Sequence, residues 1–235
     1  MYRYDPTYLL ILPAILFTMY AQFKVSSSYK KYKEIRNKKG LTGAKVARII
    51  LDSNGLSDVP VNSVEGNLTD HYDPRNRSVS LSKDIYSSKS IASLAVAAHE
   101  CGHAIQHAQK YPLMSIRSAL VPAVNLSSMA AWPLIMIGLI IPALSQSYAS
   151  LGNTLLEVGI IFFGAVVLFH LVTLPVETNA SSRALKQLET LNLVTDEDKK
   201  GARKMLTAAA MTYLAALAVA LMNMLRLIII LNRRR

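Results

Sequence analysis

Several features are scarce or missing in this chain of 235 residues. A single cysteine rules out an internal disulfide and disfavours a structural zinc site, which usually contains several cysteines. Acidic residues are few, with 15 Asp and Glu against 26 Lys and Arg, so the formal net charge is +11. The sequence also shows neither an internal repeat nor a low-complexity tract. The lack of repeats argues against a transporter built from paired halves.

Hydrophobic residues, by contrast, make up 51% of the chain, and the mean hydropathy is +0.27 despite the high positive charge. Such a mixture indicates apolar blocks separated by basic ones, which is typical of a membrane protein. The apolar runs are residues 8–23, 120–144, 155–176 and 205–231. The first just reaches the length of a membrane span and is read as a retained anchor, and the others are long enough to cross. The sequence therefore predicts four membrane helices.

A basic segment follows the first apolar run. Residues 24–48 carry nine Lys and Arg against one acid, Glu34. The positive-inside rule places this segment, and the chemistry that follows it, on the cytoplasmic side of the cell membrane. Because the charges lie beside an apolar run, anionic lipid headgroups are a better partner for them than nucleic acid, and no nucleic-acid partner is expected.

A small polar module is predicted over residues 24–116. Residues 42–54 have the pattern of an amphipathic helix, with Thr42 as N-cap and Gly55 just after its end. Residues 59–64 and 67–72 read as strands, and a further strand contains Val79 and Leu81, alternating with serines. Residues 73–76 (D-P-R-N) are a turn signal between the last two strands. The expected structure is a β-hairpin directly before the next helix.

The most informative stretch is residues 99–103, which read H-E-C-G-H and match the pattern H-E-x-x-H. It lies in residues 90–109, whose many Ala, Ile, Leu and Val residues and lack of proline favour a helix. On a helix His99 and His103 would present two imidazoles to one point. This spacing predicts a zinc site, with Glu100 as the candidate general base. The alternative is a pair of histidines that are satisfied by hydrogen bonds in an apolar core.

A catalytic zinc ion takes three protein ligands and a water, so a third ligand is needed. Glu177 ends the third apolar run, at the membrane boundary where the histidine helix also ends. Glu157, earlier on the same run, would lie about 30 Å away at the rise of an α-helix. Ala180 and Ala184 follow Glu177 on one helix face and leave room for a close approach to Gly102. We therefore expect Glu177 to be the third ligand; the alternative is that it caps a helix end.

Other polar residues near the motif have less specific roles. Cys101 lies on the opposite side of the helix and is expected to pack in the core. His71 and Tyr72 in the hairpin are candidates for oxyanion stabilisation, although residues that merely cap a sheet are commoner. A strand edge beside a metal can bind an extended peptide through main-chain hydrogen bonds, or can simply pack the helix. The candidate substrate strand consists of Asn67, Leu68, Thr69 and Asp70.

Three motifs together resemble a known family. They are H-E-C-G-H within residues 90–107, L-T-D-H-Y-D-P at residues 68–74, and L-P-V-E followed by N-A-S at residues 174–181. They look like the YugP-type integral membrane zinc metallopeptidases, and the likeness runs from about residue 43 to residue 216. The chain is more distantly similar to the HtpX-type and CAAX-prenyl-protease membrane peptidases, which pair H-E-x-x-H with a later E-x-x-A-D.

This resemblance implies a gluzincin-like zinc peptidase with a glutamate as third ligand, carried onto Glu177. Ser181 stands where the related families have an aspartate. Asn179 and Ser181 are therefore the candidates to hydrogen-bond the zinc histidines from behind.

The sequence thus predicts a mainly α membrane protein with about four transmembrane helices. A small α+β zincin-like module, made of the β-hairpin and the HExxH helix, is expected between the first and second. A single membrane metallopeptidase domain is expected over residues 1–235, with segments 24–116 and 177–204 on the cytoplasmic side. Its expected function is a zinc-dependent endopeptidase that hydrolyses peptides or membrane proteins through a zinc-activated water, with one zinc ion per chain. The alternative is a non-catalytic membrane protein with a structural or regulatory zinc site.

Overall fold

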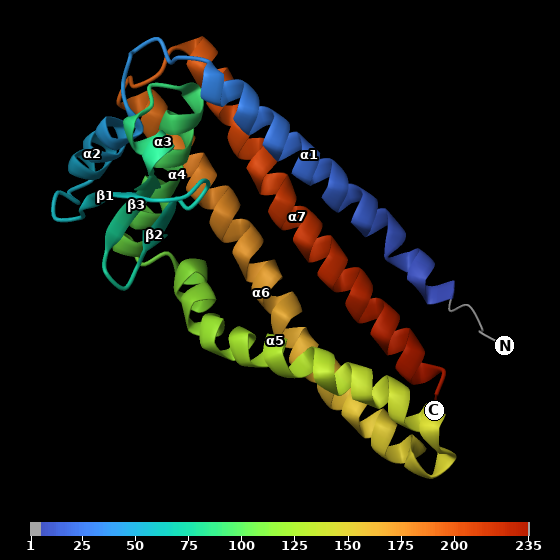
Figure 1. Cartoon of the computed structure of the whole chain (residues 1–235). Helices are drawn as coiled ribbons and strands as arrows, with labels where there is room; N and C mark the ends of the chain where they lie inside the picture. The colour runs from blue at the N-terminus through green and yellow to red at the C-terminus, as the bar shows by residue number, and fades with distance from the viewer. Residues whose placement is uncertain (1–5, 235) are drawn as a thin grey trace. The chain divides into compact units, whose positions relative to one another are not determined.

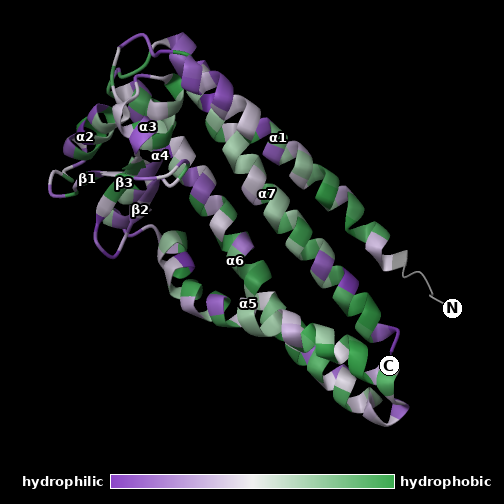
Figure 2. Cartoon of the chain, viewed as in Figure 1, coloured by the Kyte–Doolittle hydropathy of each residue, from purple (hydrophilic) through white to green (hydrophobic). Residues whose placement is uncertain are grey.

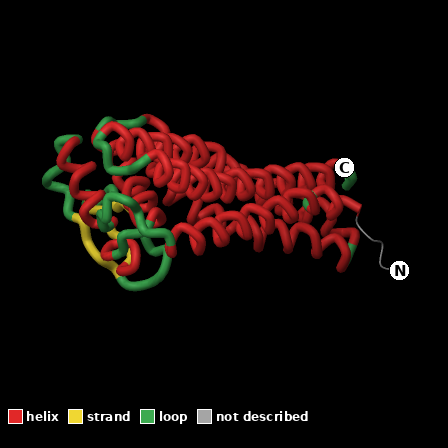
Figure 3. Tube along the Cα trace, turned by 90° about the horizontal axis from the view of Figure 1, so that it is seen from above, coloured by secondary structure: helices red, strands yellow, loops and turns green. Residues whose placement is uncertain are grey.

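The computed structural model describes residues 6–234, and helices make up most of that length (Figure 1). The described strands, yellow in Figure 3, all lie between α2 and α3. In chain order the elements are η1 (Pro6–Leu10), α1 (Leu12–Glu34), α2 (Gly43–Ser53), β1 (Val61–Val64), β2 (His71–Asp73), β3 (Ser78–Ser82), α3 (Lys83–Ser87), α4 (Ile91–Ala108), α5 (Pro112–Leu144), η2 (Gln146–Tyr148), α6 (Ala149–Thr190) and α7 (Asp196–Asn232). The prediction of a mainly α protein is confirmed.

Four of the described helical stretches are long and apolar enough to cross a membrane, as predicted. They are Thr7–Glu34, Pro112–Pro142, Gln146–Thr190 and Asp196–Asn232. Each is longer than the apolar run that predicted it, because the helix continues into polar sequence; α6, for example, runs past Pro175 to Thr190. Large apolar side chains such as Met129 (77% exposed) and Ile161 (74%) lie on the outside of these helices. Figure 2 shows the resulting apolar stretches in green.

The chain divides into two compact units, which are described separately. The first contains Met1–Tyr20, Ile116–Leu174 and Tyr213–Arg235, and the second contains Ala21–Ser115 and Pro175–Thr212. In the first, glycines allow α5 and α6 to pack closely: a Cβ on Gly159 would lie 2.7 Å from Ile135 Cγ1. Arg226 of α7 is buried in this unit, where its Nε donates to Thr7 Oγ1 at 3.2 Å.

The second unit is built around α4. Val46 and Ile50 of α2 are fully buried in the same apolar core as Leu94 and Ala98 of α4. Helix α2 begins as predicted, because the Thr42 side chain accepts a hydrogen bond from Lys45 N at 3.2 Å. The unit also carries a three-stranded sheet of order β1-β3-β2. Its central strand, β3, is buried throughout and pairs antiparallel with β2 and parallel with β1.

One strand prediction is wrong over most of its length. Residues 67–70 were expected to be part of a strand that continues to Tyr72, but β2 begins only at His71. The chain bends before it, with Gly66 at φ +103° and Leu68 at φ 57°, both in the left-handed region. The Asp70 carboxylate then accepts hydrogen bonds from the backbone and side chain of Ser82, in place of a strand-to-strand pairing at that position.

Candidate active site

Helix α4 carries the H-E-C-G-H motif in the interior of the second unit. It begins where the Ser90 side chain caps Ser93 N at 3.1 Å, and its C-cap is Gln109. The helix is buried along most of its length because alanine, isoleucine and leucine occupy the faces around the motif. Cys101 packs as predicted: it is fully buried, and its Sγ lies 3.6 Å from Ala47 O. Burial raises the pKa of its thiol, so it is no thiolate ligand.

Helix α6 approaches α4 closely at one point. A Cβ on Gly102 would lie 2.6 Å from Ala180 O, so only glycine permits this contact. Ala180 and Ala184 are both fully buried, as their small side chains suggested. The close approach brings Glu177, one turn before Ala180, to the two histidines of α4.

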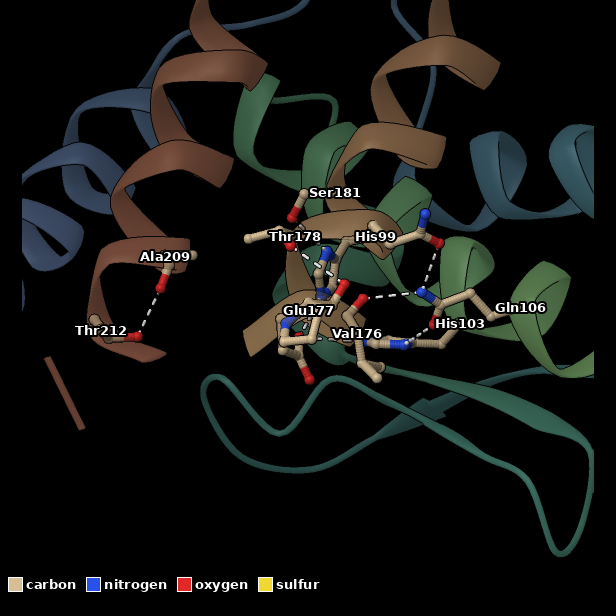
Figure 4. Close-up of polar contacts among 11 residues, drawn as sticks. His99, His103, Gln106, Val176, Glu177, Thr178, Ser181, Ala209 and Thr212 are labelled. Carbon is tan, nitrogen blue, oxygen red and sulfur yellow. Dashed lines mark hydrogen bonds and ion pairs between the residues drawn. The ribbon is translucent and has the colours of Figure 1, made fainter. Parts of the chain in front are cut away.

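Three side chains converge at this contact (Figure 4). Glu177 Oε2 lies 3.2 Å from His99 Nε2 and 3.4 Å from His103 Nε2. One donor atom from each of the three residues can be chosen so that all lie within 4.8 Å of one another. The two imidazole rings are nearly perpendicular, with centroids 4.8 Å apart. Two neutral imidazoles and a carboxylate are a donor set suited to zinc.

The Nδ1 atom of each imidazole, on the side away from Glu177, also has a hydrogen-bond partner. His99 Nδ1 lies 3.2 Å from Ser181 Oγ, and His103 Nδ1 lies 3.0 Å from Gln106 Oε1. Gln106 is fully buried. Its Nε2 donates to Asn179 Oδ1 at 2.9 Å, so Asn179 reaches His103 through Gln106. Asn179 and Ser181 were predicted from the sequence, whereas Gln106 was not. Its signal was a polar residue one turn after His103 on an apolar helix.

In the absence of a metal ion, the charge around the site favours a protonated His103. Burial disfavours the charged imidazole, but the hydrogen bond with Glu177 and the charge of Glu100 outweigh it and raise the pKa of His103. Glu100 itself is only 8% exposed. In the part of the chain that the structure describes, its carboxylate makes no hydrogen bond, which leaves its oxygens available to water or a ligand.

The hairpin candidates do not touch the three converging side chains. Tyr72 OH lies 2.7 Å from His107 Nδ1, one turn beyond His103 on α4. Burial raises the pKa of Tyr72, so its phenol stays protonated at neutral pH. His71 is exposed, and its Nδ1 contacts Thr69 O at 2.7 Å. Residues 67–69 are exposed as well.

Comparison with known proteins shows to which family the chain belongs. A family model described as "Putative neutral zinc metallopeptidase" matches residues 7–232. The chain belongs to this zinc metallopeptidase family. It is 44% identical over 221 residues to "Putative membrane protease YugP" of Bacillus subtilis (strain 168), and the alignment covers 94% of each chain. No solved structure matches the chain significantly.

Proposed function

We propose that this chain is an integral membrane endopeptidase that hydrolyses peptide bonds with a zinc ion. The observation that carries the proposal is the convergence of His99, His103 and Glu177, from helices far apart in sequence, while Ser181 and Gln106 occupy the outer nitrogens of the two imidazoles. The family membership and the four membrane-length helices support it. A multi-pass membrane protease of this kind also agrees with the name of the B. subtilis relative.

One zinc ion per chain would be held by His99 Nε2, His103 Nε2 and a Glu177 oxygen. When bound, zinc would supply Lewis-acid chemistry, because it polarises a carbonyl group and makes water acidic enough to lose a proton near neutral pH. Among the described residues, no fourth His, Cys, Asp or Glu joins the group. Structural zinc sites are closed by four protein ligands, so a group of three supports a catalytic site over the structural alternative.

Glu100 is proposed as the general base. It directly follows His99, is mostly buried and keeps its carboxylate without a hydrogen-bond partner among the described residues. It would accept a proton from the attacking water as the water oxygen bonds to the carbonyl carbon. It would then return this proton to the amide nitrogen as the C–N bond breaks, so that a carboxylic acid and an amine result.

Substrate binding is proposed at the chain that precedes β2. The backbone groups of Asn67 and Leu68 have no hydrogen-bond partner within the described chain, and both residues are exposed. Unpaired main-chain groups can bind an extended peptide, so residues 67–70 remain our candidate for this role even though they form a bend. His71 stays a candidate for stabilising the oxyanion, whereas Tyr72 OH lies at His107, one turn beyond His103, and is not proposed for that role.

The active site is proposed to face the cytoplasm, because nine basic residues lie in segment 24–48. We treat residues 1–235 as a single functional domain, and the family match across both units supports this.

Glu100→Gln tests the proposal. Glutamine keeps the shape of the side chain but cannot accept the proton, so purified protein should keep its zinc and lose about 10²- to 10⁴-fold in peptide hydrolysis. Zinc content by elemental analysis and casein cleavage should be measured on the same preparation. Hydrolysis at the wild-type rate would refute the mechanism, and loss of zinc would make Glu100 a ligand instead of a base.

A further inference from the structure

The second unit, which contains the three converging side chains, also has a cavity of about 370 Å³ beside the C-terminal half of α4. Part of its wall is apolar, formed by the buried side chains of Leu56 and Val59 together with Ala104 and Ala108 of α4. The remaining lining residues are polar or charged. The mixture suits the stem and the polar end of a peptide side chain or terminus.

Two residues that line the cavity lie on the helix face that carries Glu100. Glu100, Ala104 and His107 are spaced i, i+4 and i+7 on α4, so they form one stripe of the helix surface. Ala104 and His107 line the cavity. His107 lies about 10 Å beyond Glu100 along the helix axis. An extended peptide covers this distance in about three residues.

Both charged residues that line the cavity are cations, and both have an unusual backbone. Arg77 has φ 49° and Lys110 has φ 52°, in the left-handed region that favours glycine. Lys110 is the first residue after the C-cap of α4, where its N–H donates to His107 O at 3.0 Å. Glycine is the usual residue at this position of a helix end. Both long cationic side chains line this one cavity and give it a positive charge that suits an anionic ligand.

Hydrogen-bond donors are available at the same place. Arg77 pairs with Asp58 at 3.2 Å, but both side chains are more than half exposed, and the guanidinium has further N–H groups to donate. Tyr72 OH and His107 Nδ1 share one hydrogen bond. If the phenol donates, His107 Nε2 carries the ring proton; if the imidazole donates, the phenol proton is free. Either way the pair has one more donor to offer to a ligand.

We propose that this cavity binds a carboxylate of the substrate peptide about three residues from the scissile bond. The carboxylate would come from an acidic side chain or from the C-terminus of the substrate. The inference rests on the proposed peptidase function, because it identifies the ligand by its distance from Glu100.

The test is affinity selection with the full-length Glu100→Gln protein, purified in detergent with zinc. It is incubated with a proteome-derived peptide library, half of it amidated at the C-terminus, and bound peptides are sequenced by mass spectrometry. We expect enrichment of peptides with a carboxylate at one position. Adding Arg77→Asn and Lys110→Asn should weaken binding of these peptides about tenfold or more, because charge-assisted hydrogen bonds are lost. Asparagine tolerates the left-handed backbone, so the fold should be kept.

Arg75→Asn is the matched control, since Arg75 is exposed in the same turn as Arg77 and does not line the cavity. A second variant with glycine at positions 77 and 110 should repeat the loss with an unstrained backbone. If amidation removes the enrichment, the carboxylate is the C-terminus; if enrichment persists, it is a side chain. No carboxylate enrichment, or equal enrichment in the double variants, would overturn the cavity proposal. Selected peptides that wild-type protein binds but does not cleave would overturn the peptidase proposal instead.

Discussion

The sharpest prediction concerns Gln106, because its amide has only one orientation that satisfies its neighbours. Its Nε2 lies 2.9 Å from Val176 O, which can only accept a hydrogen bond. It also lies 2.9 Å from Asn179 Oδ1, and that oxygen is identified by the Arg183 Nε donor at 2.7 Å. Gln106 Oε1 must therefore face His103 Nδ1, which has to carry the ring proton. In the neutral ring that binds a metal, the lone pair of His103 is then on Nε2, the nitrogen that faces Glu177.

Replacing Gln106 with methionine keeps its length and removes this constraint. A buried N–H at His103 Nδ1 would lose its acceptor, which costs about 1–3 kcal/mol. The ring can avoid this cost by moving the proton to Nε2, but that nitrogen then cannot bind a metal. Outer hydrogen bonds of this type change metal affinity by about 10- to 100-fold. We therefore expect the zinc dissociation constant of Gln106→Met to rise by about that factor.

The measurement is zinc competition against a chelator of known affinity, on protein in detergent. Gln187→Met is the matched control: Gln187 is a partly buried glutamine of the same unit, and its hydrogen bonds go to Asn54, away from the histidines. The control should lose stability but keep its zinc affinity. Wild-type zinc affinity in Gln106→Met would show that the amide does not set the tautomer of His103.

Three further experiments test the third ligand, the close contact between α4 and α6, and the membrane topology. Glu177→Ala should lower zinc occupancy and abolish hydrolysis, whereas Glu189→Ala, which loses only an exposed pair with Lys199, should do neither; an active, fully metallated Glu177→Ala protein would contradict the ligand assignment. Gly102→Ala should destabilise the unit by about 1–3 kcal/mol and weaken zinc binding, because its Cβ meets Ala180 O; a normal melting temperature and zinc content would argue against the close contact. A cysteine at Lys38 in a Cys101→Ala background should react with an impermeant reagent only after the membrane is opened, and labelling of intact cells would reverse the proposed topology.

Features that depend on neighbouring residues were predictable from the sequence. The N-terminal ends of α2 and α4 are fixed by the Thr42 and Ser90 side chains, each of which accepts a hydrogen bond from the backbone N–H three residues later. Hydrophobic length likewise predicted the four long helices, although it did not predict where they end. Apolar runs mark only the part that suits lipid, whereas helix α6 continues because nothing in residues 177–190 stops it.

The strand expected over residues 67–72 shows which information is missing from a local sequence pattern. Residues 67–72 have the composition of a strand, but strand formation requires a partner in register, and β3 pairs only with residues 71–73 on that side. The deciding contacts are the Asp70 carboxylate on Ser82 and the left-handed backbone of Leu68. The alternation of polar and apolar residues predicts neither the hydrogen bonds between Asp70 and Ser82 nor the positive φ of Leu68.

The candidate site, too, combines contacts within one helix with contacts between helices. Helix periodicity alone places His99 beside His103, so two of the three proposed metal ligands can be predicted from five consecutive residues. Glu177 depends on a contact between two helices, and that contact requires the absence of a side chain at Gly102. Gln106 combines both cases: its contact with His103 is local, whereas the partner that orients its amide, Val176, lies seventy residues away. The motif therefore specifies which nitrogen atoms can meet, but the packing of α6 on α4 determines whether they carry a lone pair in the direction of Glu177.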